Sequence, residues 1–205
     1  LLTISGGTIF FAAGLAWRYF VISGLAVLGA IPIIWERLHD YQRNRVFTFL
    51  DPERDPLGAG YHILQSKIAL GSGGLFGKGF MAGSQAHLNF LPEKQTDFIF
   101  TMLGEELGFV GGIFLLVLYC LTLIVAFNTA LQCRNQFGRL LAIGVAVSFF
   151  FYVFINTAMV MGLLPVVGVP LPLVSYGGTA MLSLMFAFGL LQSCHIHRNI
   201  EIGRG

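Results

Sequence analysis

Charged residues are scarce in this chain of 205 residues. Asp, Glu, Lys and Arg make up 11% of it, whereas hydrophobic residues make up 56% and 20 positions are Phe. Soluble globular domains carry about 25% charged residues, so this composition excludes an ordinary soluble domain. It predicts an integral membrane protein, and the chain is interpreted as all-α.

Cysteine is equally scarce, with three in the chain and no CxxC spacing. This pattern suggests neither a disulfide framework nor a Cys-based metal site. The five His residues contain no HExxH motif, and His195 with His197 is interpreted as part of an interfacial tail.

Long apolar runs, in contrast, are abundant. A helix needs about 20 apolar residues to cross the ~30 Å hydrocarbon layer, and four runs are interpreted as such spans: 19–35, 99–127, 140–164 and 179–194. A fifth run, 1–16, opens without Met or a basic leader and is interpreted as a truncated span of a longer parent. The chain is therefore predicted to be a polytopic helical bundle.

The few charges are unevenly placed. Nine of the ten acidic residues and seven of the twelve basic ones lie between Glu36 and Glu106. The other basic residues, at 18, 134, 139, 198 and 204, share one face if the spans alternate in direction, and the positive-inside rule makes that face, with the tail 195–205, cytoplasmic. The long loop 36–98 and the uncharged segment 165–178 are then expected outside. Arg37, Arg43 and Arg45 count against this orientation, because they lie close to the end of a span on the side expected to be outside.

The long loop opens with WERLHDYQRNRVFTF (35–49), where charged and aromatic residues recur at helical spacing. This pattern predicts that the preceding span continues out of the membrane as an amphipathic helix, which Asp51-Pro52 ends. After a turn-rich stretch, residues 61–70 are predicted to form a short interfacial or re-entrant helix.

A glycine-rich run, GSGGLFGKG (71–79), follows that helix. It is not a Walker A motif, because Ser72 stands where the first Gly is needed and Gly79 follows Lys78 in place of Ser or Thr. Two interpretations stay open: a flexible surface loop, or a clamp whose backbone N–H groups hold the diphosphate of a lipid-linked substrate.

In NFLPEKQTDFIFTMLGEELG (89–108), acidic residues lie at the start of a predicted span and within it. Ionised carboxylates at membrane depth cost about 2.5–3.5 kcal/mol each, so these side chains should face protein or water. Asp97, which precedes an apolar stretch, is interpreted as functional. For Glu105 and Glu106 two roles stay open: binding backbone and a neighbouring Arg or Lys, or lining a site.

Pro and Gly gather in GLLPVVGVPLPLVSYGGTAM (162–181), between two apolar runs. Irregular backbone at membrane depth is tolerated only where protein buries it or where it lines a cavity. Residues 165–178 are therefore expected to re-enter the membrane and to form a wall of the site. Asn156, in the preceding span, is interpreted first as a helix–helix hydrogen bond and second as a ligand contact.

Three strings in order, DPLGAGYHILQSKIALGSGGLFGKG, FLPEKQTDFIFTMLGEELGFVGG and LPVVGVPLPLVSYGGTAM, resemble the bacterial SEDS family (shape, elongation, division and sporulation proteins). The resemblance covers essentially the whole chain and is greater to the rod-shape branch than to the division branch. It implies the second half of a ten-span fold. It also implies a peptidoglycan glycosyltransferase of the inner membrane that polymerises lipid II, the undecaprenyl-linked disaccharide-pentapeptide, on the outer face during cell elongation.

The resemblance further implies the residues of the site. The family's catalytic acidic residue occupies the TDFIF position, which is Asp97 here. Many relatives have His before Thr-Asp, whereas this chain has Gln95, so Asp97 is the sole candidate base on the loop. The implied substrate-binding residues are Gln65, Ser66, Lys67, Lys78, Lys94, Ser175, Tyr176, Gly177 and Gly178, with Glu105, Thr96 and Asn156 as possible support.

These residue types suit glycosyl transfer from a diphosphate to a hydroxyl. The reaction needs a base near the acceptor, and partial burial beside Phe98 and Phe100 makes the carboxylate of Asp97 a stronger base. It also needs positive charge near the departing phosphates, which the lysines of the loop supply, with or without a divalent cation such as Mg²⁺ or Mn²⁺.

Two other functions stay open. Many spans with Pro and Gly breaks also suit a flippase or transporter of the lipid precursor, although the spans hold few ionisable residues for a polar path. A scaffold that only recruits a cell-wall synthase is the third possibility. The resemblance implies lipid II, membrane lipid and a class B penicillin-binding transpeptidase as partners, and no nucleic acid.

Overall fold

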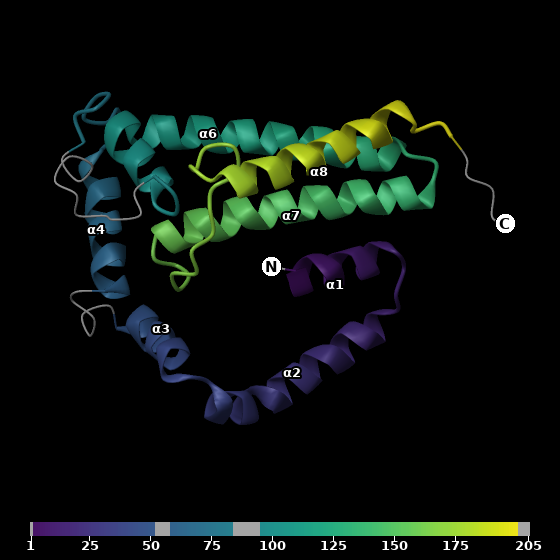
Figure 1. Cartoon of the computed structure of the whole chain (residues 1–205), viewed down its shortest axis with the longest axis horizontal. Coiled ribbons are helices and arrows are strands. Elements are labelled where there is room, and N and C mark those ends of the chain that lie inside the picture. Colours follow the sequence, from purple (N-terminus) through teal and green to yellow (C-terminus); the bar gives the residue numbers. More distant parts are fainter. Residues whose placement is uncertain (1, 52–57, 84–94, 201–205) are drawn as a thin grey trace.

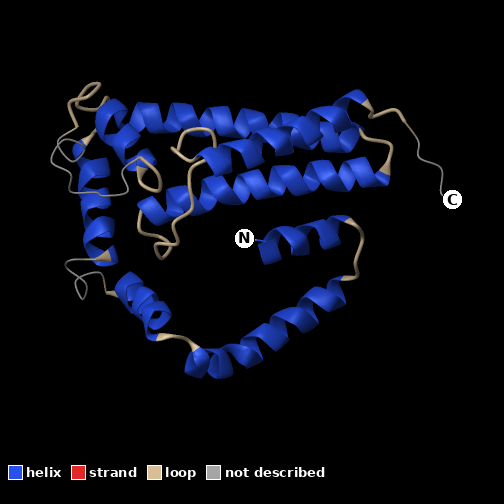
Figure 2. Cartoon of the chain, in the orientation of Figure 1, coloured by secondary structure: helices blue, strands red, loops and turns tan. Residues whose placement is uncertain are grey.

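The computed structural model describes residues 2–51, 58–83 and 95–200, which form helices joined by turns and loops, without strands (Figure 2). The helices of these residues are α1 (Leu2–Ala12), α2 (Trp17–Arg37), α3 (Asp40–Leu50), α4 (Ala59–Ser72), α6 (Ile99–Gln132), α7 (Gln136–Val160) and α8 (Gly178–Ile196). Four of them, α2, α6, α7 and α8, are long and apolar enough to cross a membrane. The prediction of an all-helical chain with several spans is confirmed.

Helices α6, α7 and α8 form the central bundle and run along the length of the molecule (Figure 1). At one end the core consists mainly of small residues, which let the backbones approach closely. These are Ala126, Ala130, Ala142 and Ala146, with Leu191. At the other end larger side chains, including Tyr119 and Phe149, fill the core and pack edge to face. Helix α1 packs on α7, where Ile9 lies against Gly144.

Helix α4 lies across the end of the bundle where α7 ends, and it contacts both α6 and α7 (Figure 1). Ile63, Ser66 and Ala69 are buried, and their spacing places them on one face of the helix. Leu64 and Ile68 are exposed on another face. The short helix predicted at 61–70 is thus present, and it runs over 59–72.

The stretch predicted to continue the 19–35 span is helical and ends before Asp51, as expected, but its continuity with that span is wrong. Helix α2 ends at Arg37, the backbone at Leu38 is extended, and α3 begins as a separate helix. The guanidinium of Arg43 donates hydrogen bonds to the carbonyl oxygens of Trp35 (2.7 Å) and Glu36 (2.8 Å). These carbonyls belong to the last turn of α2, where no intrahelical partner exists, so Arg43 stabilises the break.

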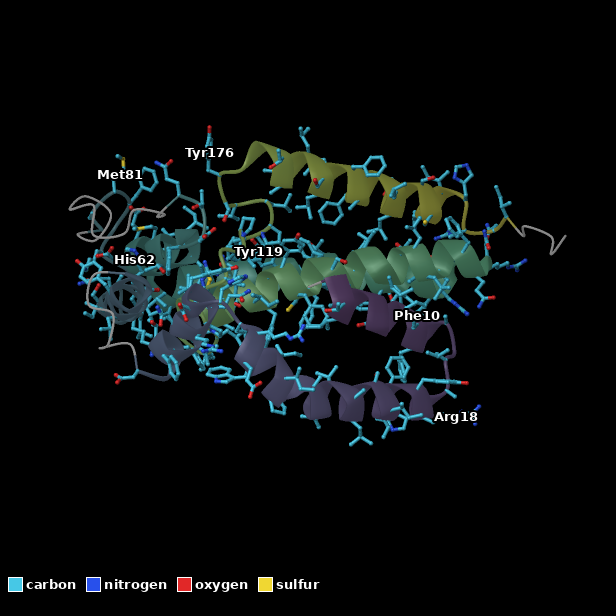
Figure 3. The ribbon with its side chains drawn as sticks, turned by 60° about the horizontal axis from the view of Figure 1, so that its bottom comes forward. Phe10, Arg18, His62, Met81, Tyr119 and Tyr176 are labelled. Carbon is cyan, nitrogen blue, oxygen red and sulfur yellow. The ribbon has the colours of Figure 1, made fainter. Side chains whose placement is uncertain are left out.

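Several basic residues lie toward one end of the molecule. Arg134, in the turn between α6 and α7, donates its backbone N–H to the carbonyl oxygen of Arg198, which follows α8 (3.0 Å). Arg18, at the start of α2, lies toward the same end of the molecule (Figure 3). The turn between α6 and α7 and the end of α8 lie at the opposite end of the bundle from α4 and from the irregular segment 161–177 (Figure 1).

Candidate functional site

Helix α6 is broken near its start, and the glycine-rich run fills the break. Gly108 has φ 69° and ψ −165°, which no helix accommodates, so the carbonyls before it and the N–H groups after it lack partners within α6. Four backbone hydrogen bonds of 2.9–3.1 Å supply those partners: Lys78 N–H to Glu105, Gly79 N–H to Glu106, Phe109 N–H to Gly74 and Val110 N–H to Leu75.

The glycine-rich run is therefore a structural element of the α6 break. The N–H groups of Lys78 and Gly79, which a diphosphate clamp would need, already bind carbonyl oxygens of α6. Gly77 has φ +77°, and a Cβ at this position would overlap the carbonyl group of Glu106. The run needs glycine here because its backbone lies directly against that of α6. Most of the run is nevertheless exposed at the surface, and a role in holding a diphosphate stays a prediction.

Lys78 and Glu105 form an ion pair beside this break. Glu105 is fully buried, and its Oε1 lies 2.7 Å from Nζ of Lys78, whose side chain is 30% exposed. Burying a carboxylate is costly unless it is paired, so the ammonium group stabilises the buried acid. Of the two roles left open for Glu105, the structure shows the pairing with a lysine. The charge of Lys78 is correspondingly directed at Glu105.

The segment that carries Asp97 is tied to the segment between α7 and α8. Three successive carbonyl oxygens each accept a hydrogen bond: Gln95 from the N–H of Tyr176 (2.8 Å), Thr96 from Oγ of Ser175 (2.5 Å) and Asp97 from Nδ2 of Asn156 (2.8 Å). The structure thus brings residues 95–97 together with the Pro/Gly segment, about 80 residues later in the chain.

The side chains of Asp97 and Lys67 both lie against glycines of that Pro/Gly segment. Asp97 is half-buried, and its Oδ2 is 3.2 Å from the position that a Cβ at Gly168 would take. Lys67 is exposed, and its Nζ is 2.8 Å from the Cβ position of Gly162. The carboxylate and the ammonium group are therefore both directed to residues 162–168. Both glycines have positive φ, so a side chain there would be strained as well as crowded.

The Pro/Gly segment is irregular, and part of it is buried. Val169, Leu171 and Ser175 are buried, as expected for irregular backbone that protein covers. The hydroxyl of Tyr119, from the middle of α6, donates to the carbonyl oxygen of Pro172 (2.6 Å). Oγ of Ser175 accepts from the N–H of Leu171 (2.7 Å). Side chains of the spans and of the segment itself thus satisfy its backbone.

Two hollows border this segment and share Ser175 and Met181. An open pocket of about 500 Å³ is lined by Gln95, Ile99, residues 174–178 and Met181. It contains the predicted residues Ser175, Tyr176, Gly177 and Gly178 but not Asp97. A second, largely apolar groove of about 530 Å³ runs between α7 and α8 and reaches Ile9 of α1. Tyr176 is 77% exposed and projects from the same end of the molecule as Met81 (Figure 3).

The remaining predicted residues differ in their placement. Ser66 is fully buried; its Oγ donates to the carbonyl oxygen of Val160 and lies 2.8 Å from Oγ1 of Thr101. It therefore joins α4 to α6 and α7 and serves helix packing. Gln65 lies half-buried on α4. Lys94 lies outside the described residues. No group of three His, Cys, Asp or Glu residues that could hold a metal ion occurs in the part of the chain that the structure describes.

The helix–helix hydrogen bond expected of Asn156 is wrong, because Asp97 and Val169, whose carbonyls it binds, lie outside the helices. Sequence reasoning also missed the hydrogen bond from Tyr119 to Pro172, the docking of the glycine-rich run and the double hydrogen bond made by Asn156. A conspicuous signal existed only for the last, since a lone Asn in an apolar span needs a partner. Which groups it binds depends on segments that are distant in sequence.

Known proteins resemble this chain closely. The family model of the cell cycle proteins FtsW, RodA and SpoVE matches residues 1–200. The chain is 54% identical over 201 residues to the peptidoglycan glycosyltransferase MrdB of Escherichia coli K12, covering 98% of this chain and 54% of that protein. It is 47% identical over 156 residues to the peptidoglycan glycosyltransferase RodA of Treponema pallidum, covering 76% of this chain and 36% of that protein.

A solved structure shows the same fold. It comes from work on the structural coordination of polymerization and crosslinking by a peptidoglycan synthase complex, and it matches with a TM-score of 0.77 and 34% identity, over 94% of this chain and 53% of that chain. The present chain spans about half the length of the curated relatives it matches.

Proposed function

This chain belongs to the family of cell cycle proteins that comprises FtsW, RodA and SpoVE, and from that premise we propose that it forms the catalytic part of a peptidoglycan glycosyltransferase that polymerises lipid II during cell elongation. The relatives MrdB and RodA carry this activity in their names. The observation that carries the proposal is the placement of Asp97. Its carbonyl oxygen accepts a hydrogen bond from Asn156, the two residues before it are bonded to residues 175 and 176, and its carboxylate lies against Gly168.

In the proposed reaction, Asp97 takes the proton of the acceptor hydroxyl while the hydroxyl oxygen attacks the anomeric carbon of the donor sugar. The new C–O bond forms as the bond from that carbon to the diphosphate oxygen breaks, and the undecaprenyl diphosphate leaves with the electron pair. Lys67, which lies over the same segment as Asp97, stabilises the negative charge that develops on the leaving phosphates.

The two hollows suit the two parts of such a substrate. The open pocket at Gln95 and residues 174–178 would present the side chains of Gln95 and Tyr176 to a sugar or a phosphate. The groove between α7 and α8 is apolar and would take a segment of the isoprenoid chain. A divalent cation such as Mg²⁺ or Mn²⁺ stays a prediction from the sequence, and it would be held mainly by the phosphates of the substrate.

The chain is a multi-pass membrane protein, and we place it in the bacterial inner membrane. The end with Arg18, Arg134 and Arg198 would face the cytoplasm, and the end with Asp97 the outside, where lipid II is polymerised. A class B penicillin-binding transpeptidase is the proposed partner, since the solved neighbour concerns a complex that coordinates polymerization with crosslinking. The ten-span architecture of the whole protein stays a prediction.

The test uses the intact protein and its partner in liposomes with fluorescent lipid II. The wild type and an Asp40→Asn control, which alters an exposed carboxylate on α3, should form glycan polymer. Asp97→Asn, inserted to the same level, should form none. Polymer formed by Asp97→Asn at the wild-type rate would refute the proposal. Transfer of lipid II across the bilayer by a wild type that forms no polymer would establish the flippase instead.

A further inference from the structure

Asn156 occupies a central position between the two halves of the candidate site. It lies in α7, is fully buried, and uses both hydrogens of its side-chain amide. Nδ2 donates to the carbonyl oxygen of Asp97 (2.8 Å) and to that of Val169 (2.7 Å). One side chain therefore holds the backbone of Asp97 and the residue next to Gly168, against which the carboxylate of Asp97 lies.

The orientation of this amide follows from its partners. Both groups that it meets are carbonyl oxygens, which accept hydrogen bonds only, so a flipped amide would place oxygen against oxygen. Oδ1 is buried and has no hydrogen-bond partner among the described residues. A buried acceptor without a partner costs about 1–3 kcal/mol, which an apolar side chain in the span would avoid. The unpaired Oδ1 offsets part of what the two hydrogen bonds of Nδ2 contribute to stability, and those two bonds join main-chain groups on both sides of the site.

We infer that Asn156 is a positioning residue for the reaction, an inference that rests on the proposed function. It acts through Asp97 and need not touch the substrate. By fixing the main chain of Asp97 and that of Val169 together, it sets the position of the carboxylate relative to residues 162–168. A displacement of about 1 Å in a reacting group lowers a rate by about 100-fold, which sets the size of the effect expected when this link is lost.

The chain offers a matched control one residue further along α7. Thr157 is also buried, but its Oγ1 bonds only to carbonyls of its own helix, those of Val153 (2.8 Å) and Phe154 (3.1 Å). Thr157→Val therefore removes a buried polar group from the same helix without touching the site. Asn156→Ala removes both hydrogen bonds to the site, and Asn156→Asp removes the amide hydrogens while keeping the shape of the side chain.

The experiment measures kcat and KM for lipid II with the intact protein and its partner, together with thermal stability. Asn156→Ala and Asn156→Asp should lower kcat by about 100-fold and leave KM within about threefold, while Thr157→Val keeps the wild-type kcat. Three results would each overturn the inference: an unchanged kcat in folded Asn156→Ala, a raised KM with kcat intact, or failure of both Asn156 variants to fold while Thr157→Val folds.

Asp97→Asn is measured in parallel to separate this inference from the proposed function. If Asp97→Asn is inactive and folded Asn156→Ala has full activity, the positioning role is wrong and the proposed function stands. If Asp97→Asn retains full activity, the proposed function fails, and the positioning role fails with it.

Discussion

Replacing Lys78 by Met tests whether the ion pair with Glu105 holds the glycine-rich run in the break of α6. The substitution keeps the apolar stem of the side chain and removes the ammonium group 2.7 Å from Oε1 of Glu105. The four backbone hydrogen bonds between the run and α6 can persist, so the change isolates the charge. What it leaves behind is a fully buried carboxylate that has lost its cationic partner.

The expected magnitude follows from the burial of the two partners. Removing one member of a buried ion pair costs about 3–5 kcal/mol, since the other charge is left uncompensated. Lys78 is 30% exposed, so water reaches the pair from one side and the lower end of that range, about 3 kcal/mol, is expected. Glu105→Gln leaves the partly hydrated ammonium group instead and should cost less, about 1–2 kcal/mol.

The assay is the free energy of unfolding of the intact protein in detergent, followed by circular dichroism for both single variants and the double variant. The double variant should be more stable than the sum of the single effects predicts, with a coupling of about 2 kcal/mol. Additive effects, or a Lys78→Met protein as stable as the wild type, would refute the view that this pair stabilises the break.

Two further changes test the packing around the site. Gly77→Ala should lower the free energy of unfolding by about 2 kcal/mol or more, because the residue has positive φ and its Cβ would overlap the carbonyl of Glu106. The control Gly71→Ala, in open space on α4, should be neutral or slightly stabilising. Equal effects of the two substitutions in a thermal melt would contradict this prediction. Tyr119→Phe should cost about 1 kcal/mol and increase hydrogen exchange near Pro172, and unchanged exchange there would contradict the role of that hydroxyl.

The spans could be predicted from sequence because the requirement is local. A helix that crosses lipid needs a long apolar run, and four such helices lie close to the predicted ranges. The packed, irregular Pro/Gly segment could be foreseen for the same kind of reason, since Pro165, Pro170 and Pro172 prevent a regular helix. The identity of the groups that bury this segment could not be predicted.

The breaks in α2 and α6 could not be predicted from the sequence, because each depends on a group from another element of the chain. Helix α2 ends where the side chain of Arg43, from the next helix, binds its last carbonyls. Helix α6 breaks at Gly108 because the glycine-rich run, about 30 residues earlier, satisfies the exposed backbone groups. The local sequence shows Gly108 in the second case and no glycine in the first, and in neither case does it show which group will bind there.

For the site, the residue types that carry the chemistry were easier to predict than the groups that each of them contacts. Asp97 and Glu105 are both carboxylates beside an apolar span, and sequence alone left the role of Glu105 open. The structure separates them by their neighbours: Glu105 is buried against a lysine, whereas Asp97 is half-buried against Gly168. Ser66, a substrate-binding residue by resemblance, is buried between helices because its spacing along α4 places it on the packed face.

The measurement that bears most directly on the central claim is the rate of glycosyl transfer in the Asp97→Asn protein at saturating lipid II, together with its affinity for lipid II. If Asp97 is the base, the rate should fall by at least about 100-fold while the dissociation constant stays within a few-fold of the wild-type value. A rate close to that of the wild type, in a protein that binds lipid II normally, would contradict the assignment of Asp97 as the base.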